Sequence, residues 1–282
     1  MIIVESIKEA KEIIREKKRR GLKIGFVPTM GCLHLGHISL IEKARKLSDY
    51  VVVSIFVNPT QFGPNEDYDK YPRTFEQDKI MCEIHNVSMI FHPSVQEMYP
   101  QNFSTFVEVT GQISQVLCGA KREGHFRGVA TVVSKLFNIV EPDVAIFGQK
   151  DAQQAFIIKK MVKELDFPIE IVVSETVREE DGLAMSSRNN YLSKEERAIA
   201  PLIKKALDEA EEAFKKGETK AEILKKKVEQ IINSSPLFKI DYVEIVDTEN
   251  FNPVDEVSSE SLLAVAAFLG KTRLIDNLIL KK

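Results

Sequence analysis

The sequence predicts an α/β protein with a doubly wound parallel sheet and a smaller C-terminal α+β domain, and three observations carry this prediction. Strand and helix patterns alternate through residues 1–175, as they do in repeated βαβ units. The run YVVVSIFV at residues 50–57 is almost continuously apolar, which suits a central parallel strand covered on both faces. In residues 176–282, charged amphipathic helices precede three strand-like segments, which is typical of an antiparallel sheet with helices.

The N-terminal half contains the signals of alternating helices and strands. Ser6 and Glu9 form a capping box that opens a helix, and Gly21 ends it. The basic run KKRR at residues 17–20 lies at the C-terminus of that helix, where it favours the helix dipole rather than nucleic acid. Further helices are expected after PTMGCLHLGH, from a cap at Thr74 and Gln77, over residues 128–140, and after GQKD. The strands are expected over residues 22–27, 50–57, 87–91, 143–147 and 169–173.

The C-terminal part changes character after about residue 174. Two helices are expected over residues 195–216 and 219–233. Three strands are expected over residues 240–246, 262–269 and 273–280. We therefore expect two domains, residues 1–175 and residues 176–282.

Composition and charge argue against several classes of protein function. The 39 Lys and Arg residues against 42 Asp and Glu give a net charge of −3, so no global basic field attracts nucleic acid or an anionic membrane. The longest apolar run, residues 262–269, is too short to span a bilayer, and the N-terminus lacks the order of a signal peptide. Cys32, Cys82 and Cys118 fit neither a disulfide framework nor a zinc site. A cytoplasmic location is expected.

The motif HLGH places two histidines three residues apart at the start of a helix that follows a predicted strand. His34 and His37 then share a face near the helix N-terminus, where free N–H groups and the helix dipole attract anions. Gly31 and Gly36 leave room for a nucleotide to approach the backbone. The alternative is a pair of surface histidines or half of a zinc site, but the other three histidines add no matching pattern. The motif therefore favours phosphate binding.

Two further segments carry groups suited to phosphate. GQKD follows a strand at the carboxyl edge of the sheet, so Lys150 can neutralise charge that develops on an α-phosphate. In MSSR, the hydroxyls of Ser186 and Ser187 stand beside Arg188, a combination suited to the β- and γ-phosphates. Either segment alone also fits an ordinary surface turn. Their occurrence with HLGH favours a nucleotide site.

Two carboxamides complete the candidate site. Gln61 follows one sheet strand in NPTQF, and Gln154 follows another in DAQQA. Amide donors position a carboxylate without neutralising it, as a carboxylate that must attack phosphorus requires. Without the other motifs, both would be ordinary loop and helix glutamines. With them, the sequence predicts an enzyme that uses ATP to activate a small carboxylic acid.

Together these motifs resemble the pantothenate synthetase (pantoate–β-alanine ligase) family. PTMGCLHLGH, VVSIFVNPTQFGPNEDYDKYPRT, HFRGVATVV, FGQKD and TVREEDGLAMSSRN occur in family order, strongly over residues 20–195 and loosely elsewhere. The resemblance implies that ATP and pantoate give pantoyl adenylate and pyrophosphate, and that β-alanine then displaces AMP to give pantothenate. It also implies a Rossmann-like, HIGH-motif domain for ATP and pantoate, a second domain that carries MSSR and closes over the site, Mg²⁺ carried largely by the phosphates, and a homodimer.

The resemblance assigns roles to the phosphate-binding residues. His34 and His37 would hold the triphosphate, with His37 at the position of the proton donor, and Lys150 would steady the α-phosphate. Ser186 and its two neighbours in SSR would hold the outer phosphates. The implied ATP site comprises Met30, Gly31, His34, Gly36, His37, Gly148, Gln149, Lys150, Asp151, Val177, Met185, Ser186, Ser187 and Arg188.

The resemblance also assigns the acid substrate to Gln61 and Gln154, with Gln61 near β-alanine as well and Asn58 supporting that pocket. The family usually reads GEKD, whereas this chain has Gln149, which keeps the size of Glu but loses its charge. Cys32 stands where a small apolar residue is common. Neither change touches the phosphate-binding set.

Three further expectations concern motion, assembly and alternatives. The loop after Asn58, with Gly63, Pro64, Asp67 and Tyr71, is expected to close over the site and exclude water from an acyl-adenylate. An apolar strand at residues 106–109 is compatible with a dimer.

A nucleotidylyltransferase that transfers AMP to a phosphate ester shares HLGH but does not explain the paired glutamines. A regulatory nucleotide-binding protein with an inactive site is the other alternative, and the intact phosphate set argues against it.

Overall fold

The first half of the chain folds into a six-stranded sheet in which every paired strand runs parallel. The computed structural model describes residues 1–64 and 66–281; Asn65 of the predicted loop and Lys282 of the second predicted domain lie outside the described residues. The strand order is β1-β4-β3-β2-β5-β6, which confirms the doubly wound sheet. The strands are β1 Ile2–Val4, β2 Ile24–Thr29, β3 Tyr50–Ile55, β4 Met89–Phe91, β5 Val144–Gly148 and β6 Glu170–Ser174.

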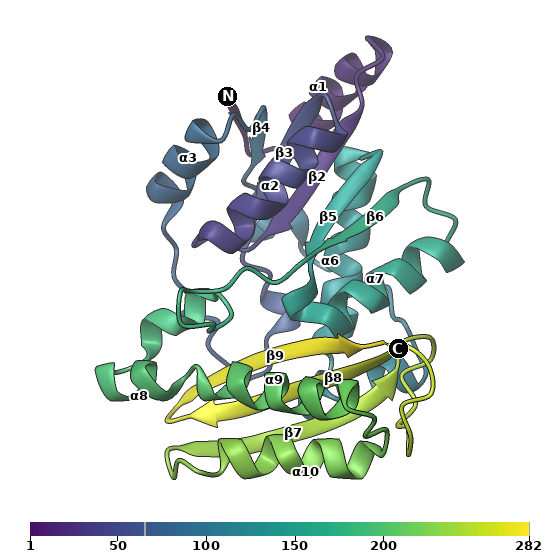
Figure 1. The fold of residues 1–282 in the computed structure, drawn as a ribbon. Helices are drawn as coiled ribbons and strands as arrows, with labels where there is room; N and C mark the ends of the chain where they lie inside the picture. Colours follow the sequence, from purple (N-terminus) through teal and green to yellow (C-terminus); the bar gives the residue numbers. More distant parts are fainter. Residues whose placement is uncertain (65, 282) are drawn as a thin grey trace.

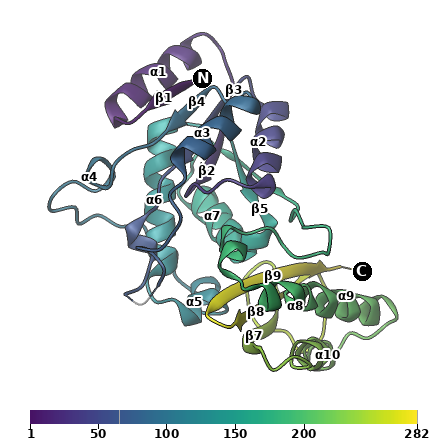
Figure 2. The ribbon, with the colours of Figure 1, turned by 90° about the vertical axis from the view of Figure 1, so that its left-hand side faces the viewer.

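Helices cover both faces of this sheet, as its apolar central strands require. One face packs against α1 (Ile7–Arg19), α6 (His125–Val140) and α7 (Ala152–Glu164) in a core that includes Phe26 and Phe137. The other face packs against α2 (Leu35–Leu47) and α3 (Phe75–Ile84). Figure 2 shows α6 and α2 on opposite sides of the sheet.

The N-terminal half differs from the sequence predictions in several details. Strand β1 was not predicted, because three residues are too few to show an alternating pattern. The cap of α1 is confirmed, since the Ser6 hydroxyl accepts a hydrogen bond from the Glu9 amide. Thr74 is the N-cap residue of α3, as predicted, but its hydroxyl donates to Asp78 and makes no cap hydrogen bond. The predicted strand at residues 106–109 is wrong, because this segment joins no sheet.

The second half forms the antiparallel sheet β7-β8-β9, as predicted. The predicted helix over residues 195–216 is two helices, because Pro201 has no N–H to donate and interrupts the helix. The bounds are α8 Lys194–Ile199, α9 Leu202–Lys215, α10 Ala221–Ile232, β7 Phe238–Asp247, β8 Ser261–Leu269 and β9 Thr272–Leu280. The short helices are η1 Pro59–Gln61, α4 Val95–Met98, η2 Gln112–Ser114, α5 Cys118–Lys121, η3 Gln149–Asp151 and η4 Ser187–Tyr191.

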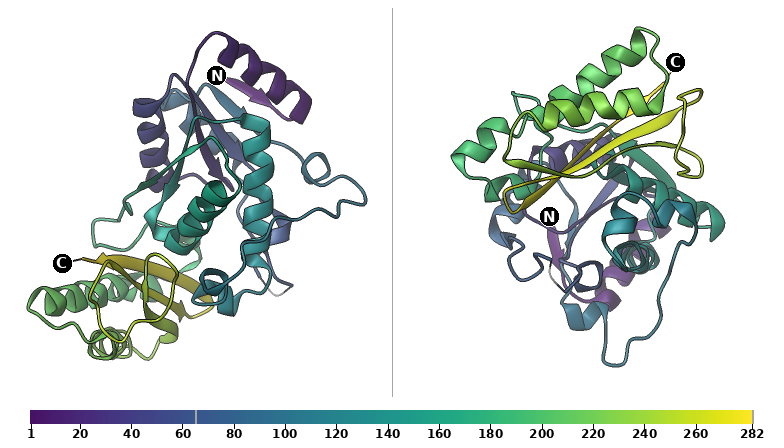
Figure 3. Two further views of the ribbon diagram at one scale, coloured as in Figure 1. Left: turned by 90° about the vertical axis from the view of Figure 1, so that its right-hand side faces the viewer. Right: turned by 90° about the horizontal axis from the view of Figure 1, so that it is seen from below.

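The small sheet is buried on both faces, and this joins the two halves of the molecule (Figures 1 and 3). Leu263 and Val265 of β8 pack with α9 and α10 in one core. Leu262 and Ala264, which point to the opposite face, belong to the core of the first half. The second half therefore lies against the carboxyl edge of the large sheet, where the candidate site is found.

Candidate active site

A cavity of about 230 Å³ lies where strands β2, β3 and β5 end. Nearly all of the site residues predicted from the sequence line this cavity, although they come from segments far apart in the chain. Gly31 and Gln149 are the two predicted residues outside its lining. The predicted residues that line it are Met30, His34, Gly36, His37, Asn58, Gln61, Gly148, Lys150, Asp151, Gln154, Val177, Met185, Ser186, Ser187 and Arg188.

The two histidines of HLGH are held by the first turn of α2. His34 is the N-cap residue, and its Nδ1 accepts a hydrogen bond of 3.1 Å from the Gly36 amide. His37 Nδ1 accepts a hydrogen bond of 3.3 Å from the His34 amide. Because both Nδ1 atoms accept, each neutral ring carries its proton on Nε2. The ring centroids lie 4.1 Å apart, so two neighbouring Nε2–H donors are available to one ligand.

Burial keeps both rings neutral. Desolvation, with the charge of Lys150 adding to it, lowers the pKa of His34 to about 4. Desolvation, together with His34 and Lys150, lowers the pKa of His37 to about 3. The phosphate side of the cavity therefore offers two uncharged imidazoles and one ammonium group at neutral pH.

The turn that presents these histidines depends on a buried acid that sequence reasoning missed. Asp78 of α3 is 2% exposed and accepts hydrogen bonds from the backbone amides of Cys32 (3.0 Å) and Leu33 (2.7 Å). Gly31 has a φ of +83°, and a Cβ there would lie 2.9 Å from an Asp78 carboxylate oxygen. Gly31 thus serves the turn rather than the cavity wall. The motif ending in YPRT stops at Thr74, so no sequence signal pointed to Asp78.

Gln61 points its amide nitrogen toward the cavity because its oxygen is already bonded. Asn58 Nδ2 donates to Gln61 Oε1 at 3.0 Å, and Gln61 Nε2 donates to the weak acceptor Met30 Sδ at 3.3 Å. Asn58 is 1% exposed, and its Oδ1 accepts from the Tyr99 hydroxyl at 2.7 Å. Gln154 has no side-chain hydrogen bond within the described part of the chain. Two carboxamides are therefore available to a carboxylate, whereas Asn58 supports one of them.

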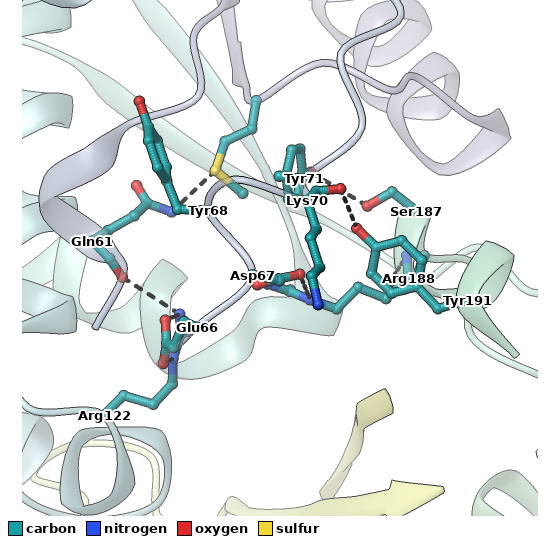
Figure 4. A network of polar contacts seen from close by, with 12 residues as sticks. Gln61, Glu66, Asp67, Tyr68, Lys70, Tyr71, Arg122, Ser187, Arg188 and Tyr191 are labelled. Atoms are coloured by element: carbon teal, nitrogen blue, oxygen red, sulfur yellow. Dashed lines mark hydrogen bonds and ion pairs between the residues drawn. The ribbon is translucent and has the colours of Figure 1, made fainter. Parts of the chain in front are cut away.

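The SSR segment lies across the cavity, but its guanidinium group is not free. Arg188 donates to both carboxylate oxygens of Asp67, at 3.0 and 2.9 Å, and the hydroxyls of Tyr71 and Ser187 lie 3.3 Å apart (Figure 4). The sequence predicted that Arg188 contacts the outer phosphates. In this structure a carboxylate of the predicted lid loop has that position.

Strand β9 holds the turn that carries Lys150. Asn277 Nδ2 donates to the backbone oxygens of Gln149 (3.0 Å) and Lys150 (2.9 Å). Gln149 Nε2 donates to Asn277 Oδ1 at 3.0 Å. The uncharged Gln149 therefore makes a neutral contact with the second half of the molecule and does not face the cavity.

A second cavity of about 420 Å³ lies beside the first, between the two halves of the molecule. Lys150, Gln154 and Arg188 line both cavities, so a ligand in one is reached from the other. Arg122 and His125 also line both, and sequence reasoning gave neither a role. Elsewhere in the smaller cavity, the Thr176 hydroxyl is buried without a hydrogen-bond partner among the described residues.

The described residues contain neither a metal-binding cluster nor a membrane-spanning helix. No group of three or more His, Cys, Asp or Glu side chains is arranged to hold a metal ion in residues 1–64 and 66–281. Over the same residues, no helix combines the length and apolar character needed to cross a membrane.

Comparisons with known proteins agree over the full length of the chain. Residues 2–279 match the family model described as pantoate-beta-alanine ligase. The pantothenate synthetase of Acetivibrio thermocellus is 55% identical over 281 residues, which is 100% of both chains. The crystal structure of pantothenate synthetase from Thermus thermophilus has a TM-score of 0.95 at 43% identity, with 100% of both chains covered. A Francisella tularensis pantoate-beta-alanine ligase, complexed with beta-gamma ATP and beta-alanine, has a TM-score of 0.81 at 37% identity, covering 99% of this chain and 97% of that one.

Proposed function

The chain belongs to the pantoate-beta-alanine ligase family, and on that premise we propose how its cavity joins pantoate to β-alanine with ATP. A pantoate carboxylate oxygen attacks the α-phosphorus of ATP, pyrophosphate leaves, and pantoyl adenylate forms. The amine nitrogen of β-alanine then attacks the acyl carbon, AMP leaves with the bonding electron pair, and the nitrogen loses a proton. The observation that carries the proposal is the convergence of His34, His37, Lys150, Gln61 and Gln154 on one cavity.

The phosphate side acts on the first step. His34 and His37 each direct a neutral Nε2–H, and Lys150 a positive charge, at the phosphates where negative charge develops. His37 is the proton donor for the leaving pyrophosphate in its protonated form, because a neutral ring that lost its Nε2 proton would become an imidazolate anion. A bound triphosphate raises the pKa of His37 again, because a nearby negative charge favours the protonated ring.

The carboxamides act on the acid. Gln61 and Gln154 hold the pantoate carboxylate by amide N–H groups, which leaves its negative charge available for attack. Asn58 fixes the orientation of Gln61 from behind. β-Alanine enters from the larger cavity, whose lining includes Gln154 and Lys150.

The remaining ATP contacts come from the second half of the chain. Ser186, Ser187 and Arg188 bind the outer phosphates once Asp67 releases the guanidinium group. Val177 lies beside the nucleotide base, which supplies a partner for the orphan hydroxyl of Thr176.

The site fits Mg²⁺ as an ion carried mainly by phosphate oxygens. Mg²⁺ retains several waters and takes one or two carboxylates, so it does not need a cluster of three protein side chains, and the described residues contain none. Asp151, half exposed beside Lys150, is the carboxylate that would hold it. When bound, the ion neutralises part of the triphosphate charge.

The same proposal covers the domain boundary, the oligomeric state and the cellular location. The domain boundary falls after β6, between residues 175 and 176, and the second domain closes over the site. The enzyme is a homodimer. It works in the cytoplasm, in agreement with the free thiols of Cys32, Cys82 and Cys118.

Exchange of labelled pyrophosphate into ATP tests the proposed reaction. We expect exchange that requires pantoate and not β-alanine, and formation of AMP and the amide product when β-alanine is added. Exchange that requires a phosphopantetheine-like ester instead would indicate a nucleotidylyltransferase. Tight ATP binding without any exchange would indicate a regulatory protein.

A further inference from the structure

We propose that His125 is a positioning residue for Gln61, and that Arg122 extends this support to Glu66 of the neighbouring loop. The inference rests on the proposed role of Gln61 in holding pantoate. His125 is the first residue of α6 and is 8% exposed. Its motif, HFRGV, has no part in the chemistry described above.

The hydrogen bonds of His125 fix both its tautomer and its partner. Its Nδ1 lies 2.8 Å from the backbone oxygen of Gln61, and its Nε2 lies 2.9 Å from Arg122 Nη1. A guanidinium group can only donate, so Nε2 accepts and the proton resides on Nδ1, from which it is donated to Gln61. Arg122 Nη2 donates to the same carbonyl oxygen at 3.4 Å. The backbone of Gln61 is therefore held by two side chains from one short segment.

The protonation state agrees with this arrangement. Burial, and then the charge of Arg122, lowers the pKa of His125 to about 4. The ring is neutral at physiological pH and keeps one donor and one acceptor. Its tautomer is opposite to that of His34 and His37, which matches a role in holding the backbone rather than binding an anion.

The first turn of α6 also contacts the Gln61 segment by close packing. A Cβ at Gly128 would lie 2.3 Å from the Thr60 oxygen and 2.7 Å from the Gln61 Cα, so only glycine allows this approach. Asn58 Nδ2 donates both to the Gly128 oxygen (3.2 Å) and to Gln61 Oε1 (3.0 Å). Helix α6 thus supports the backbone of Gln61 directly and its side chain through Asn58.

The far end of this support lies in the loop expected to close over the site. Glu66 accepts from Arg122 Nε at 2.7 Å and from Nη2 at 2.6 Å (Figure 4). Burial opposes ionisation of Glu66, but the hydrogen bonds and charge of Arg122 outweigh it and lower the pKa. The ion pair fixes the guanidinium that donates to His125. A change in loop position is thereby transmitted to the residue that holds the acid substrate.

Two substitutions separate the two hydrogen bonds of His125. In His125→Asn, the amide nitrogen can replace Nδ1 and donate to Gln61, whereas in His125→Gln, the amide lies at the Nε2 position and leaves the Gln61 carbonyl without that donor. We expect His125→Gln to raise the pantoate KM about tenfold, the effect of losing one buried hydrogen bond, and His125→Asn to raise it less than about threefold. The ATP KM should stay unchanged in both.

Three further variants make the result decisive. Gln61→Ala should raise the pantoate KM strongly; if it does not, the proposed role of Gln61 fails, independently of His125. Glu66→Gln alters only the loop end, and we expect a rise of about twofold to threefold in the pantoate KM. His85→Gln is the control, because this histidine lines neither cavity. Equal effects of His125→Asn and His125→Gln, or a parallel rise of the ATP KM, would overturn the inference, and so would an unchanged pantoate KM in Glu66→Gln.

Discussion

The phosphate half and the carboxylate half of the cavity are built in different ways. In the phosphate half, His34 and His37 belong to one helical turn, and that turn's own amides orient both rings. In the carboxylate half, Gln61 is oriented by Asn58 and by His125, which lies 64 positions further along the chain. The first arrangement is local and forms with its helix. The second exists only when α6 packs against the loop after β3.

The largest expected effect lies in the phosphate half. We expect Lys150→Ala and His37→Ala each to lower kcat by about 10²- to 10³-fold, because each removes a donor from the charge that develops on phosphate. Pantoate-dependent pyrophosphate exchange measures the loss, and the pantoate KM should change little. The fold should persist in both variants. Near-normal turnover in either would contradict the assigned roles.

The next largest effect lies in the carboxylate half. Gly128→Ala places a methyl group against the backbone of Thr60 and Gln61, which must then move. We expect a loss of about 1–3 kcal/mol in the free energy of unfolding and a rise of at least about tenfold in the pantoate KM. Urea unfolding and substrate titration measure the two quantities. Gly217→Ala is the control for a loss of stability alone, because Gly217 has a φ of +105°, at which alanine is strained, but a Cβ there meets nothing within 4 Å and the residue lines neither cavity.

This difference between the halves also decides what the sequence could predict. HLGH, GQKD and SSR each place their donors within a few residues of one another, and the sheet's carboxyl edge brings the three segments together. The parallel sheet and the small antiparallel sheet were predicted for the same reason, since periodicity is a local signal. Family resemblance then supplied the substrates, which physical chemistry alone did not identify.

The residues that were missed are those whose roles depend on distant contacts. Asp78 holds the turn before His34 from another helix, and His125 holds Gln61. Asp67 was expected in a lid, but its ion pair with Arg188 joins segments 121 residues apart and could not be predicted. Asn277, on the last strand, donates a hydrogen bond to the backbone oxygen of Lys150. No local pattern marks a hydrogen bond between such segments.

A pH experiment compares one histidine from each half. His37 and His125 have pKa values lowered to about 3 and about 4, below the unfolded value of about 6.5. The unfolded chain therefore binds more protons between these values, and the free energy of unfolding falls as pH falls through 6.5 toward 4. We expect each histidine to contribute about 1 kcal/mol to the loss between pH 7.5 and 5.5.

Urea unfolding of His37→Asn and His125→Asn at these two pH values checks this expectation. Each variant should show a smaller pH dependence of the free energy of unfolding than the parent protein. The lowered pKa of Glu66 acts in a separate window, below about pH 4.5, where unfolded carboxylates take up protons. If the free energy of unfolding of both variants depends on pH as it does in the parent protein, the two rings are not neutral and buried as described.

The smallest expected effect comes from two acids that are neighbours in the chain. Asp67 forms an ion pair with Arg188 of the phosphate half, and Glu66 forms an ion pair with Arg122 of the carboxylate half (Figure 4). Since a partly exposed ion pair contributes about 0.2–1 kcal/mol, Asp67→Asn should free the guanidinium and lower the dissociation constant of ATP by about threefold. Calorimetric titration with a non-hydrolysable ATP analogue measures this change.

The same pair of substitutions tests whether the halves are independent. Asp67→Asn should leave the pantoate KM unchanged, and Glu66→Gln should leave ATP binding unchanged, although the substituted residues are adjacent. If either variant alters both substrates, the loop moves as one body and couples the halves. Weaker ATP binding in Asp67→Asn would mean that the carboxylate orients Arg188 for phosphate rather than competing with it. In that case the ion pair is part of the binding site, and the loop must be in place before ATP binds.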